Sequence, residues 1–597
     1  MNSNLQAVDS KLARFTLVSF CLFAVLFGLT YLVLMPPLQV PDEFAHLFRI
    51  YGVSRGSCLA DREVHVPVRI AGLTAKYPGL LETHRRVSLA AIWKETGEPN
   101  DESAQRSVGY QLGSVYNCVP YIPASIGLAM ARVFHSSALI EMYAGRLANL
   151  IVYIFLSAWA ICLMPGYRLL LAALALMPMS LHQAASLSVD ALAISIGFVF
   201  CAYILKLAFD PETKQVRAPQ LAILAILTIV STSCRFNVSL LLLLFLIPVS
   251  KFSNRTISNR TWRFTAIGLY FVLAFAVALL WQWLNRANLA LMPQERLAQG
   301  IVVQNSSAAI SQHPFLFLRA AADTLVDKQL ATLAGEFVGR LGYLSVYLPY
   351  WAVLSYLVLL VALALSQSGS LILTIKQKLL LAVIVVSSAI GLCAVLWTLA
   401  ATPDLIARLG GSSAFVPGLQ GRYFISFCLP AFMLLSNRRM RVSGKPVIVF
   451  ALLIIGIVNL SAVAAIWNTY YSATPRNLAG GAQRPEKPIF GNVDSPREGS
   501  VVTQTCTVGG WAVASGSSIT RVGVYIDGRF EQQAAVGSAR PDVQGVFPDE
   551  LGAPNSGFVT ELNVAHLPAG DHILTVHAET AGGDVANVGT VRIRVAK

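Results

Sequence analysis

Long apolar runs are the feature that most constrains what this chain can fold into. The first run, from Phe15 to Met35, contains no charged residue, and about 20 apolar residues suffice to cross a bilayer as a helix. Hydrophobic residues make up 55% of the 597-residue sequence and charged residues only 13%. Because a water-soluble chain of this length does not need so much apolar surface, the sequence predicts a polytopic α-helical membrane protein.

The pattern predicts about eleven transmembrane helices. They are expected near residues 15–35, 146–164, 168–184, 190–208, 218–234, 236–250, 264–284, 347–367, 378–400, 422–436 and 446–467.

Basic residues indicate the orientation of these helices. Lys11 and Arg14 precede the first run, which lacks a small-x-small cleavage site and is therefore expected to stay as a span. Positive charge favours cytoplasmic loops, and the alternate short loops of this chain are basic. We therefore expect a cytoplasmic N-terminus, an extracytoplasmic C-terminus and large outer loops near 36–145, 286–346 and 401–421. The net charge of +14 is assigned to topology and lipid contact, not to nucleic-acid binding.

Residues 119–134, VPYIPASIGLAMARVF, are apolar enough to be a further span. Counting them as one would turn every later basic loop outward, against the rule that positive charge stays inside. The segment is also short and begins with two prolines. We expect an interfacial or re-entrant helix packed on the bundle, while an ordinary span stays open as the alternative.

The character of the chain changes near residue 475. A Pro/Gly-rich linker, 475–488, separates a transmembrane domain, 1–474, from a tail of short alternating or β-branched runs, 489–597. The tail predicts an outer antiparallel β-sandwich. Its stretches GGWAVASG, VYIDG, SARPDV and PAGDHIL resemble immunoglobulin-like modules attached to bacterial glycan-processing enzymes. A spacer or packing role and a carbohydrate-binding role both stay open.

Two cysteines of the first outer loop, Cys58 and Cys118, can form a disulfide in an oxidising compartment, or stay reduced. The sequence contains no CxxC, no P-loop and no GxGxxG motif. A nucleotide-driven pump is therefore not expected.

Charge is concentrated just after the first apolar run, in PPLQVPDEFAHLFRIYGVSRG. A carboxylate at the membrane boundary, such as Asp42, can act as a general base on a hydroxyl. A second one, Glu43, can hold a divalent cation or tune the first. Nearby cations can stabilise a phosphate leaving group. The candidates for that role are His46, Arg49, Arg85, Arg86, Arg146, Arg340 and Arg422.

Plainer readings of the same residues stay open. An Asp-Glu pair after proline is a good helix start, because carboxylates favour a helix N-terminus. Arg146 and Arg422 could be snorkelling anchors at the ends of spans. Asp190 could be a first-turn acid of the next helix.

PDEFAHLFRIYGVSRG resembles the first-loop signature of the GT-C glycosyltransferase superfamily, including the aminoarabinose transferases that modify lipid A. YNCVPYIPASIGLAMARVF resembles the Pro-rich interfacial helix of that superfamily. Together with MPMSLHQAASLSVDAL and VPGLQGRYFISFCLP, these stretches are most similar to the bacterial membrane-protein family catalogued as domain of unknown function 2142, over roughly residues 15–435.

The resemblance implies roles for particular residues. Asp42 aligns with the catalytic base, and Glu43 with a supporting or metal-binding acid. Asp190 lies where some members place an acid near a metal or the acceptor, so a magnesium or manganese ion is a candidate cofactor. The lysine of the interfacial Pro-Pro motif has no counterpart in CVPYIP. The donor is therefore expected to contact other side chains, namely His46, Arg49, Arg146, Arg422 and Tyr423.

The implied function is transfer of a sugar from a polyprenyl-phosphate-sugar donor to a cell-surface glycan or lipid-linked acceptor, on the outer side of the bacterial cytoplasmic membrane. The expected partners are that donor, that acceptor and membrane lipid. A lipid-linked glycan polymerase or ligase is the alternative. A glycolipid flippase is less favoured, because the ionisable groups collect at the ends of the spans and not inside them.

Overall fold

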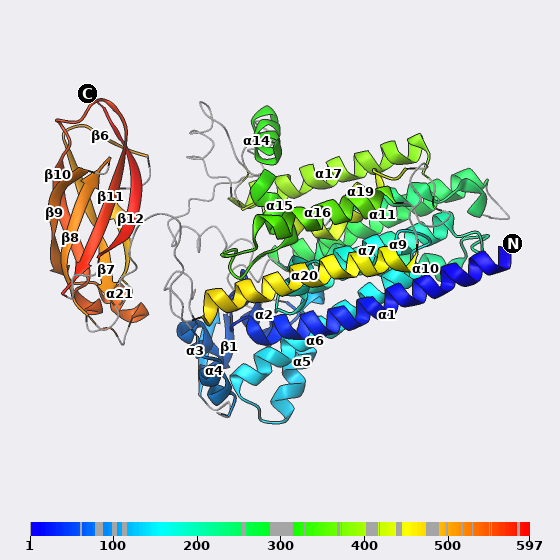
Figure 1. The fold of residues 1–597 in the computed structure, drawn as a ribbon, viewed down its shortest axis with the longest axis horizontal. Coiled ribbons are helices and arrows are strands. Elements are labelled where there is room, and N and C mark those ends of the chain that lie inside the picture. The colour runs from blue at the N-terminus through cyan, green and yellow to red at the C-terminus, as the bar shows by residue number, and fades with distance from the viewer. Residues whose placement is uncertain are drawn as a thin grey trace. The chain divides into compact units, whose positions relative to one another are not determined.

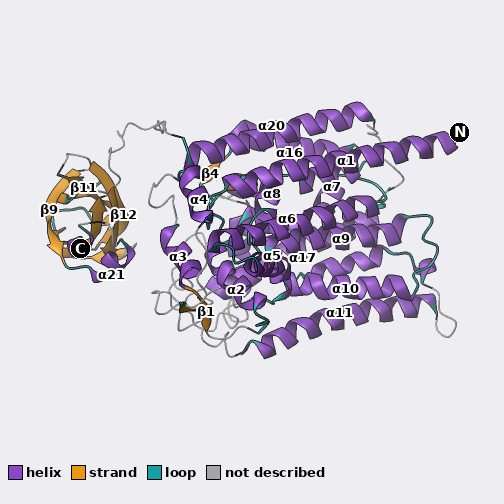
Figure 2. Ribbon diagram, turned by 90° about the horizontal axis from the view of Figure 1, so that it is seen from below, coloured by secondary structure: helices purple, strands orange, loops and turns teal. Residues whose placement is uncertain are grey.

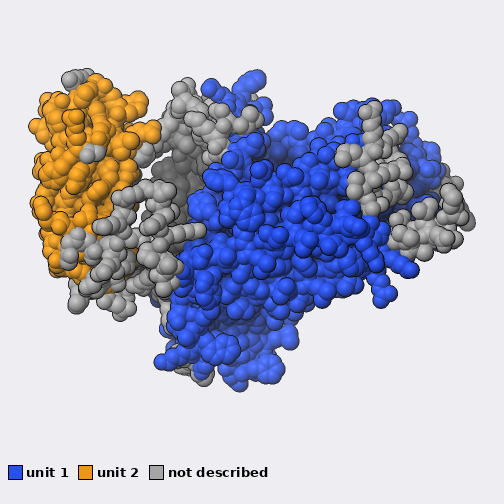
Figure 3. Space-filling view, viewed as in Figure 1, with its two compact units in different colours: residues 1–79, 86–472 blue, residues 80–85, 473–597 orange. Residues whose placement is uncertain are grey.

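The protein is described by a computed structural model. It describes residues 2–59, 63–77, 87–97, 104–109, 116–235, 237–252, 258–286, 314–326, 330–366, 371, 373–400, 416, 418–437, 444–472, 489–496, 499–514, 517–527, 529–547, 550, 552–581 and 585–596. The chain divides into two compact units, Met1–Gly79 with Arg86–Ser472, and Leu80–Arg85 with Ala473–Lys597 (Figure 3).

The first unit is helical and multi-pass in character. Within its described residues six helices are long and apolar enough to cross a membrane, and α1 and α20 run side by side (Figure 1). The six are α1 (Asn2–Leu34), α6 (Ala138–Leu163), α9 (Asp190–Phe209), α11 (Asn259–Leu284), α17 (Ile375–Ala400) and α20 (Lys445–Tyr470). Shorter apolar helices are α5 (Ile122–Val133), α10 (Ala218–Cys234) and α16 (Tyr350–Leu365).

The expected count of about eleven transmembrane helices is not confirmed. Three of the predicted spans take other forms, because prolines interrupt them or because the helix is of the tighter 3₁₀ kind. These segments are α7 (Arg168–Ala175) with α8 (Pro178–Ala184), η3 (Val238–Leu246) with η4 (Val249–Lys251), and η5 (Gly421–Phe427) with α19 (Cys428–Met433).

Side-chain hydrogen bonds stabilise the backbone at the break between α7 and α8. Pro178 opens α8 and has no N–H to continue the ladder, so backbone carbonyls of residues 173–176 need other donors. Each of these four carbonyls receives a side-chain hydrogen bond from a different residue. The donors are, in order, Tyr356, Ser180, Tyr153 and Asn459, at 2.7, 2.8, 2.9 and 3.1 Å. An interrupted helix is tolerated in a bundle when its freed backbone groups are satisfied in this way.

Residues 119–134 form η2 (Val119–Tyr121) followed by α5, which has 12 residues. At 1.5 Å per residue α5 is about 18 Å long, well short of the roughly 30 Å hydrocarbon core. It lies close against α6, since a Cβ on Gly127 would come within 2.3 Å of the Ala144 carbonyl oxygen. Its other side exposes Ile126, Met130 and Phe134. The helix is thus short for a full span, and its interfacial or re-entrant placement stays a prediction.

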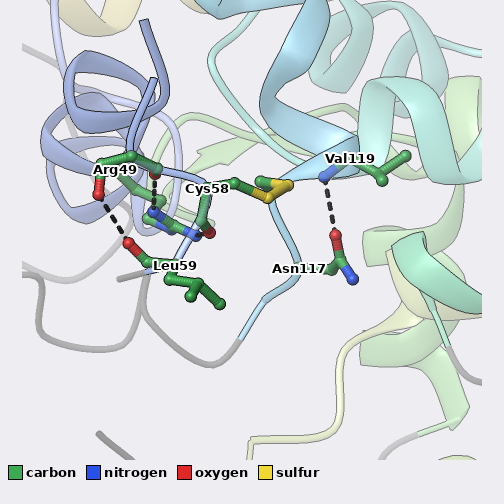
Figure 4. Close-up of a disulfide and its surroundings, with 7 residues drawn as sticks. Arg49, Cys58, Leu59, Asn117 and Val119 are labelled. Carbon is green, nitrogen blue, oxygen red and sulfur yellow. Dashed lines mark hydrogen bonds between the residues drawn. A yellow bond between two sulfur atoms is a disulfide. The ribbon is translucent and has the colours of Figure 1, made fainter. Parts of the chain in front are cut away.

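The first large loop is a compact layer on this bundle. It contains α2 (Glu43–Ser54), β1 (Glu63–Pro67), α3 (Val68–Lys76), α4 (Leu89–Thr96) and β2 (Gln105–Gly109). β1 and β2 pair antiparallel. A disulfide joins Cys58 to Cys118, with their Cα atoms 5.1 Å apart (Figure 4). Later elements of the unit are α14 (Pro314–Val326), α15 (Leu330–Val338), β3 (Arg340–Leu341) and β4 (Val346–Tyr347).

The second unit is a curved β-sheet (Figure 2). Its eight strands are hydrogen-bonded in the order β5-β7-β10-β9-β8-β11-β12-β6, with a short helix, α21 (Pro541–Val546), and a 3₁₀ turn, η6 (Ala553–Asn555). The strands are β5 (Ile489–Ser495), β6 (Ser500–Val502), β7 (Thr505–Ala514), β8 (Ile519–Ile526), β9 (Arg529–Ser538), β10 (Gly557–Asn563), β11 (Gly570–Thr580) and β12 (Val585–Val595).

The expected sandwich of two separate sheets is corrected to one half-barrel sheet. β9 pairs with β10 on one side and with β8 on the other, so the two halves are continuous. Inward residues of both halves, such as Val508, Val524 and Val576, share one core. The alternating pattern in the sequence predicted that strands would form, but it did not predict the order in which they pair.

The motifs of this unit form internal contacts. Asp527, in the left-handed conformation at φ 50°, accepts from the backbone N–H of Ile573 at 2.9 Å and lies 2.6 Å from His572 Nδ1. The other ring nitrogen of His572 lies 2.9 Å from the Pro568 carbonyl oxygen. These two acceptors raise the pKa of His572, the Asp527 hydrogen bond first. Residues of VYIDG and PAGDHIL therefore bond to each other and stabilise the turn that follows β8.

Candidate functional site

Four charged side chains from separate parts of the helical unit meet where α1, α9 and α10 have one end each. Asp42 Oδ2 lies 3.6 Å from Arg422 Nη2, and Arg422 Nε lies 3.9 Å from Asp190 Oδ2. Arg235, directly after α10, forms an ion pair with the other oxygen of Asp190. We name Asp42, Arg422, Asp190 and Arg235 the charged cluster. Its charges alternate in sign.

Asp42 is the accessible acid of this cluster. It stands at the N-terminus of α2 in the left-handed conformation, at φ 63° and ψ 6°, and its side chain makes no capping hydrogen bond. That side chain is 39% exposed, whereas the Asp190 side chain is 3% exposed. Non-glycine residues in the left-handed region are uncommon and often lie at functional sites, and aspartate tolerates that region better than most. The helix-start reading also holds, because Asp42 directly precedes α2.

Arg422 is buried but incompletely bonded. Its side chain is 3% exposed. Nη1 donates to Gln183 Oε1 at 3.2 Å, and Nη2 donates to the Tyr423 hydroxyl at 3.5 Å. Nε has no hydrogen-bond partner among the described residues. A buried donor without a partner costs about 1–3 kcal/mol, so this guanidinium has capacity for a further acceptor.

Packing explains why a glycine precedes Arg422. A Cβ on Gly421 would lie 2.0 Å from the Leu333 carbonyl oxygen of α15 and 2.6 Å from the Phe337 nitrogen. The Gly421 N–H donates to Glu336 Oε2 at 2.9 Å. η5 therefore lies directly on α15, and this contact fixes the place of the next residue, Arg422.

Tyr423 contacts both arginines of the cluster. The Arg235 guanidinium carbon is 4.6 Å from the centre of its ring, and that of Arg422 is 5.2 Å away. Such cation–π contacts hold guanidinium groups in place. Arg235 also donates to the Tyr423 carbonyl oxygen at 3.4 Å, and its side chain is 20% exposed.

Sequence reasoning missed Arg235. It stands between two apolar runs, in STSCRFNVS, on the side of the membrane that the topology assigns to Asp190. Arginine in an outer connection goes against the positive-inside tendency, and that signal could have selected it.

Glu43 and Arg146 form a different kind of pair. Both side chains are fully buried. Arg146 binds both carboxylate oxygens, with Nε to Oε1 at 2.8 Å and Nη2 to Oε2 at 2.6 Å. Arg146 also donates to the carbonyls of Met35 and Pro36 at 2.8 and 3.0 Å, and the Leu187 N–H donates to Glu43 at 3.1 Å. The pair ties the end of α1 to α6 and leaves neither group open to a substrate.

His46 lies one helical turn after Asp42. Its Nδ1 is 2.9 Å from the Tyr121 hydroxyl, and the rings of Tyr116 and Tyr121 lie 5.9 and 5.6 Å from its own. Burial lowers the pKa of His46, although the nearby carboxylates of Asp42 and Asp190 oppose that shift. A neutral imidazole therefore lines this side of the cluster. Tyr116, two residues before the disulfide at Cys118, was also missed by sequence reasoning.

The remaining basic candidates lie elsewhere. Arg49 is fully buried and donates to the carbonyls of Ser57 and Cys58 at 3.0 and 2.5 Å, beside the disulfide (Figure 4). Arg340 donates to the Leu344 carbonyl at 2.5 Å. Arg49 and Arg340 therefore stabilise the loops that contain these carbonyl groups. Arg85 and Arg86 lie outside the described residues.

A divalent cation does not fit the acids predicted to bind it. Both oxygens of Glu43 accept from Arg146, and Asp190 faces the guanidinium groups of Arg235 and Arg422. Within the described part of the chain no group of three or more His, Cys, Asp or Glu side chains could hold a metal ion. Mg²⁺ and Mn²⁺ favour oxygen ligands, and here arginines neutralise those oxygens.

The charged cluster therefore offers an accessible carboxylate beside Arg422, and a second arginine, Arg235, that shares Asp190 with Arg422. A carboxylate in that position can accept a proton. Guanidinium groups bind phosphate through several charge-assisted hydrogen bonds.

One comparison with known proteins, the family model, supports the membrane assignment. A family model described as predicted membrane protein (DUF2142) matches residues 23–431, which confirms the resemblance expected from the motifs. Membership of the GT-C superfamily stays a prediction. None of the curated proteins matches the chain. Among solved structures, the endo-beta-1,4-mannanase from Thermotoga petrophila is similar at 11% identity, with a TM-score of 0.13. That match covers 24% of this chain and 24% of that chain, so it supports no argument.

Proposed function

We propose that this chain, which belongs to the DUF2142 family of predicted membrane proteins, is a membrane glycosyltransferase. Its donor is a polyprenyl-phosphate sugar, and its acceptor is a hydroxyl of a cell-surface glycan or a lipid-linked glycan. One observation carries the proposal. Asp42 is a half-buried carboxylate at the end of a bundle of apolar helices, within 3.6 Å of the incompletely bonded Arg422.

The proposed chemistry is a single inverting displacement. Asp42 accepts the proton of the acceptor hydroxyl while that oxygen forms a bond to the anomeric carbon. The bond between the anomeric carbon and the phosphate oxygen breaks, and the polyprenyl phosphate leaves with the bonding electron pair. Arg422 stabilises the negative charge that develops on the phosphate. Positioned base catalysis is typically worth about 10²–10⁴-fold.

Arginines take the part that a divalent cation plays in other phosphate sites. Arg422 and Arg235 are both within the charged cluster, so two guanidinium groups can donate hydrogen bonds to a phosphate without metal. We therefore expect activity to survive chelation. Addition of EDTA to the purified protein tests this point, and loss of transfer that Mg²⁺ or Mn²⁺ restores would contradict it.

Orientation is part of the proposal. The disulfide between Cys58 and Cys118 favours an oxidising compartment for the first large loop, and the basic short loops favour the cytoplasm for the opposite ends. We place the protein in the bacterial cytoplasmic membrane, with the charged cluster and the β-sheet unit on the outer side. The lipid-linked donor would then present its phosphate at the height of Asp42.

The test is the profile of lipid-linked and surface glycans in cells that make the wild-type protein, Asp42→Asn, or no protein. We expect the Asp42→Asn cells to lack one sugar that the wild-type protein adds, as the cells without protein do. Asp323→Asn, which removes a carboxylate of α14 paired with Arg319, is the matched control. A complete glycan in the Asp42→Asn cells refutes the proposal.

The same profile separates the alternatives. A polymerase or ligase would change the length of the glycan or its attachment and leave its repeating unit intact. A flippase would leave complete lipid-linked glycan on the inner face.

A further inference from the structure

Resting on the proposed function, we infer that Arg235 and Arg422 together form the phosphate subsite, and that Asp42 occupies one side of it until the donor arrives. The phosphate of the polyprenyl donor then takes the place of Asp42 on Arg422. The carboxylate is thereby released as a base only after the donor has bound.

The geometry of Arg422 supports an exchange of acceptors. Its two contacts through Nη2, to Asp42 at 3.6 Å and to Tyr423 at 3.5 Å, lie at or beyond the limit of a hydrogen bond. Its Nε has no hydrogen-bond partner among the described residues. Only the bond from Nη1 to Gln183, at 3.2 Å, is of ordinary length. A phosphate oxygen can therefore bind this guanidinium with little loss of existing bonds.

Arg235 supplies the second positive charge and the more accessible one. Its side chain is 20% exposed, against 3% for Arg422. The Tyr423 ring contacts both guanidinium groups, with their central carbons 4.6 and 5.2 Å from its centre. Asp190 lies beside both guanidinium groups, and a phosphate that replaces Asp42 on Arg422 supplies a negative charge to that guanidinium in place of the carboxylate.

The exchange links binding to reactivity. While Asp42 faces Arg422, its Oδ2 lies 3.6 Å from the guanidinium and is turned toward that partner instead of toward an acceptor hydroxyl. When a phosphate binds Arg422, Asp42 loses that partner and gains a negative neighbour. The carboxylate is then free to accept the proton of the acceptor hydroxyl.

The ligand class is a phosphate ester with an isoprenoid chain. The cluster stands beside the ends of α9 and α10, two apolar helices of the bundle. That is the level at which the phosphate of a membrane lipid lies. Free inorganic phosphate shares the charge of such a ligand but not its chain.

Calorimetric titration of the full-length protein in detergent with farnesyl phosphate tests the exchange, with farnesol and inorganic phosphate as comparison probes. We expect Asp42→Asn to bind farnesyl phosphate about 1.4- to fivefold more tightly than the wild type, because a competing partly exposed ion pair is worth about 0.2–1 kcal/mol. Arg422→Gln and Arg235→Gln should bind it at least tenfold more weakly.

Two further variants test whether weaker binding results from misfolding or from loss of the phosphate contact. Arg235→Gln leaves the buried Asp190 with only the more distant Arg422 as a partner, so the double variant Arg235→Gln with Asp190→Asn removes both charges. It should still unfold near the wild-type temperature and still bind weakly. Arg319→Gln, which removes an exposed arginine of α14, should bind farnesyl phosphate as the wild type does.

The outcomes separate this inference from the proposed function. If Asp42→Asn binds farnesyl phosphate no more tightly than the wild type, or if the Arg235 variants bind it normally, the exchange is refuted while the transferase stands. If the wild type binds farnesyl phosphate no better than farnesol, the donor class and hence the proposed function fail. Equal affinity for inorganic and farnesyl phosphate would refute the lipid-linked ligand.

Discussion

Asp42 and Glu43 are adjacent acids, and each faces an arginine, but the two pairs are built in opposite ways. Glu43 and Arg146 are fully buried and joined by two hydrogen bonds of 2.6 and 2.8 Å. Asp42 is 39% exposed and lies 3.6 Å from an arginine whose Nε has no hydrogen-bond partner in the described structure. A satisfied, sealed pair holds structure, whereas a loose pair open to one side can exchange partners.

Removing one member of the sealed pair should have the largest effect. Glu43→Gln leaves Arg146 as a buried charge without a carboxylate, which typically costs about 3–5 kcal/mol. We expect a large fall in the yield of folded protein and in its unfolding temperature, measured by a thermal melt in detergent. Glu43→Gln with Arg146→Gln should recover part of that loss. A stable, active Glu43→Gln protein would show that the two pairs do not differ as described.

Removing the exposed acid should leave the fold intact and stop the reaction. Asp42→Asn keeps the size of the side chain and loses the base, so we expect transfer to fall by about 10²–10⁴-fold. The unfolding temperature should stay close to that of the wild type, because partly exposed ion pairs contribute about 0–1 kcal/mol. Transfer activity and unfolding temperature should be measured on the same preparations. If the variant loses stability together with activity, Asp42 has a structural role and is not the base.

The disulfide is expected to support the layer that carries both acids. Cys58→Ser removes a link across 60 residues, and such links typically stabilise by about 2–4 kcal/mol. We expect a lower unfolding temperature and partial loss of transfer. Labelling of the freed Cys118 by a membrane-impermeant maleimide in intact cells also reports the side of the loop. Labelling only after the inner face is opened would contradict the proposed orientation.

The smallest effect should come from a third acid–base pair, Asp527 with His572 in the β-sheet unit. The pKa of His572 is raised by its hydrogen bond to Asp527, so its contribution is complete below the ordinary value of about 6.5 and is lost as the pH rises through the raised value. We expect hydrogen exchange at the Ile573 amide, which donates to Asp527, to accelerate over that range beyond the normal increase with pH. His572→Gln should remove this extra dependence, and its persistence would mean that another group causes it.

Much of this arrangement follows from local patterns. Apolar runs predicted the helices at α1, α6, α9, α11, α17 and α20, and alternation predicted strands after residue 488. The two prolines of residues 119–134 predicted a short helix, which α5 is. The prediction was weaker where tertiary contacts overrode the pattern. Residues 168–184 break at Pro178, and the donors for the freed carbonyls come from residues as distant as Asn459.

By itself the sequence determined the membrane class, the family and the place where charge gathers, because these depend on composition, spacing and short motifs. Only the tertiary structure decided which of two adjacent acids is available. The availability of each acid depends on an arginine that is distant in sequence. Arg146 is 103 positions from Glu43, and Arg422, near the other end of the helical unit's sequence, lies beside Asp42. The tertiary structure also brought Arg235 beside Asp190. Charge and hydropathy are properties of a residue, but burial and hydrogen-bond partners arise only when distant segments pack together.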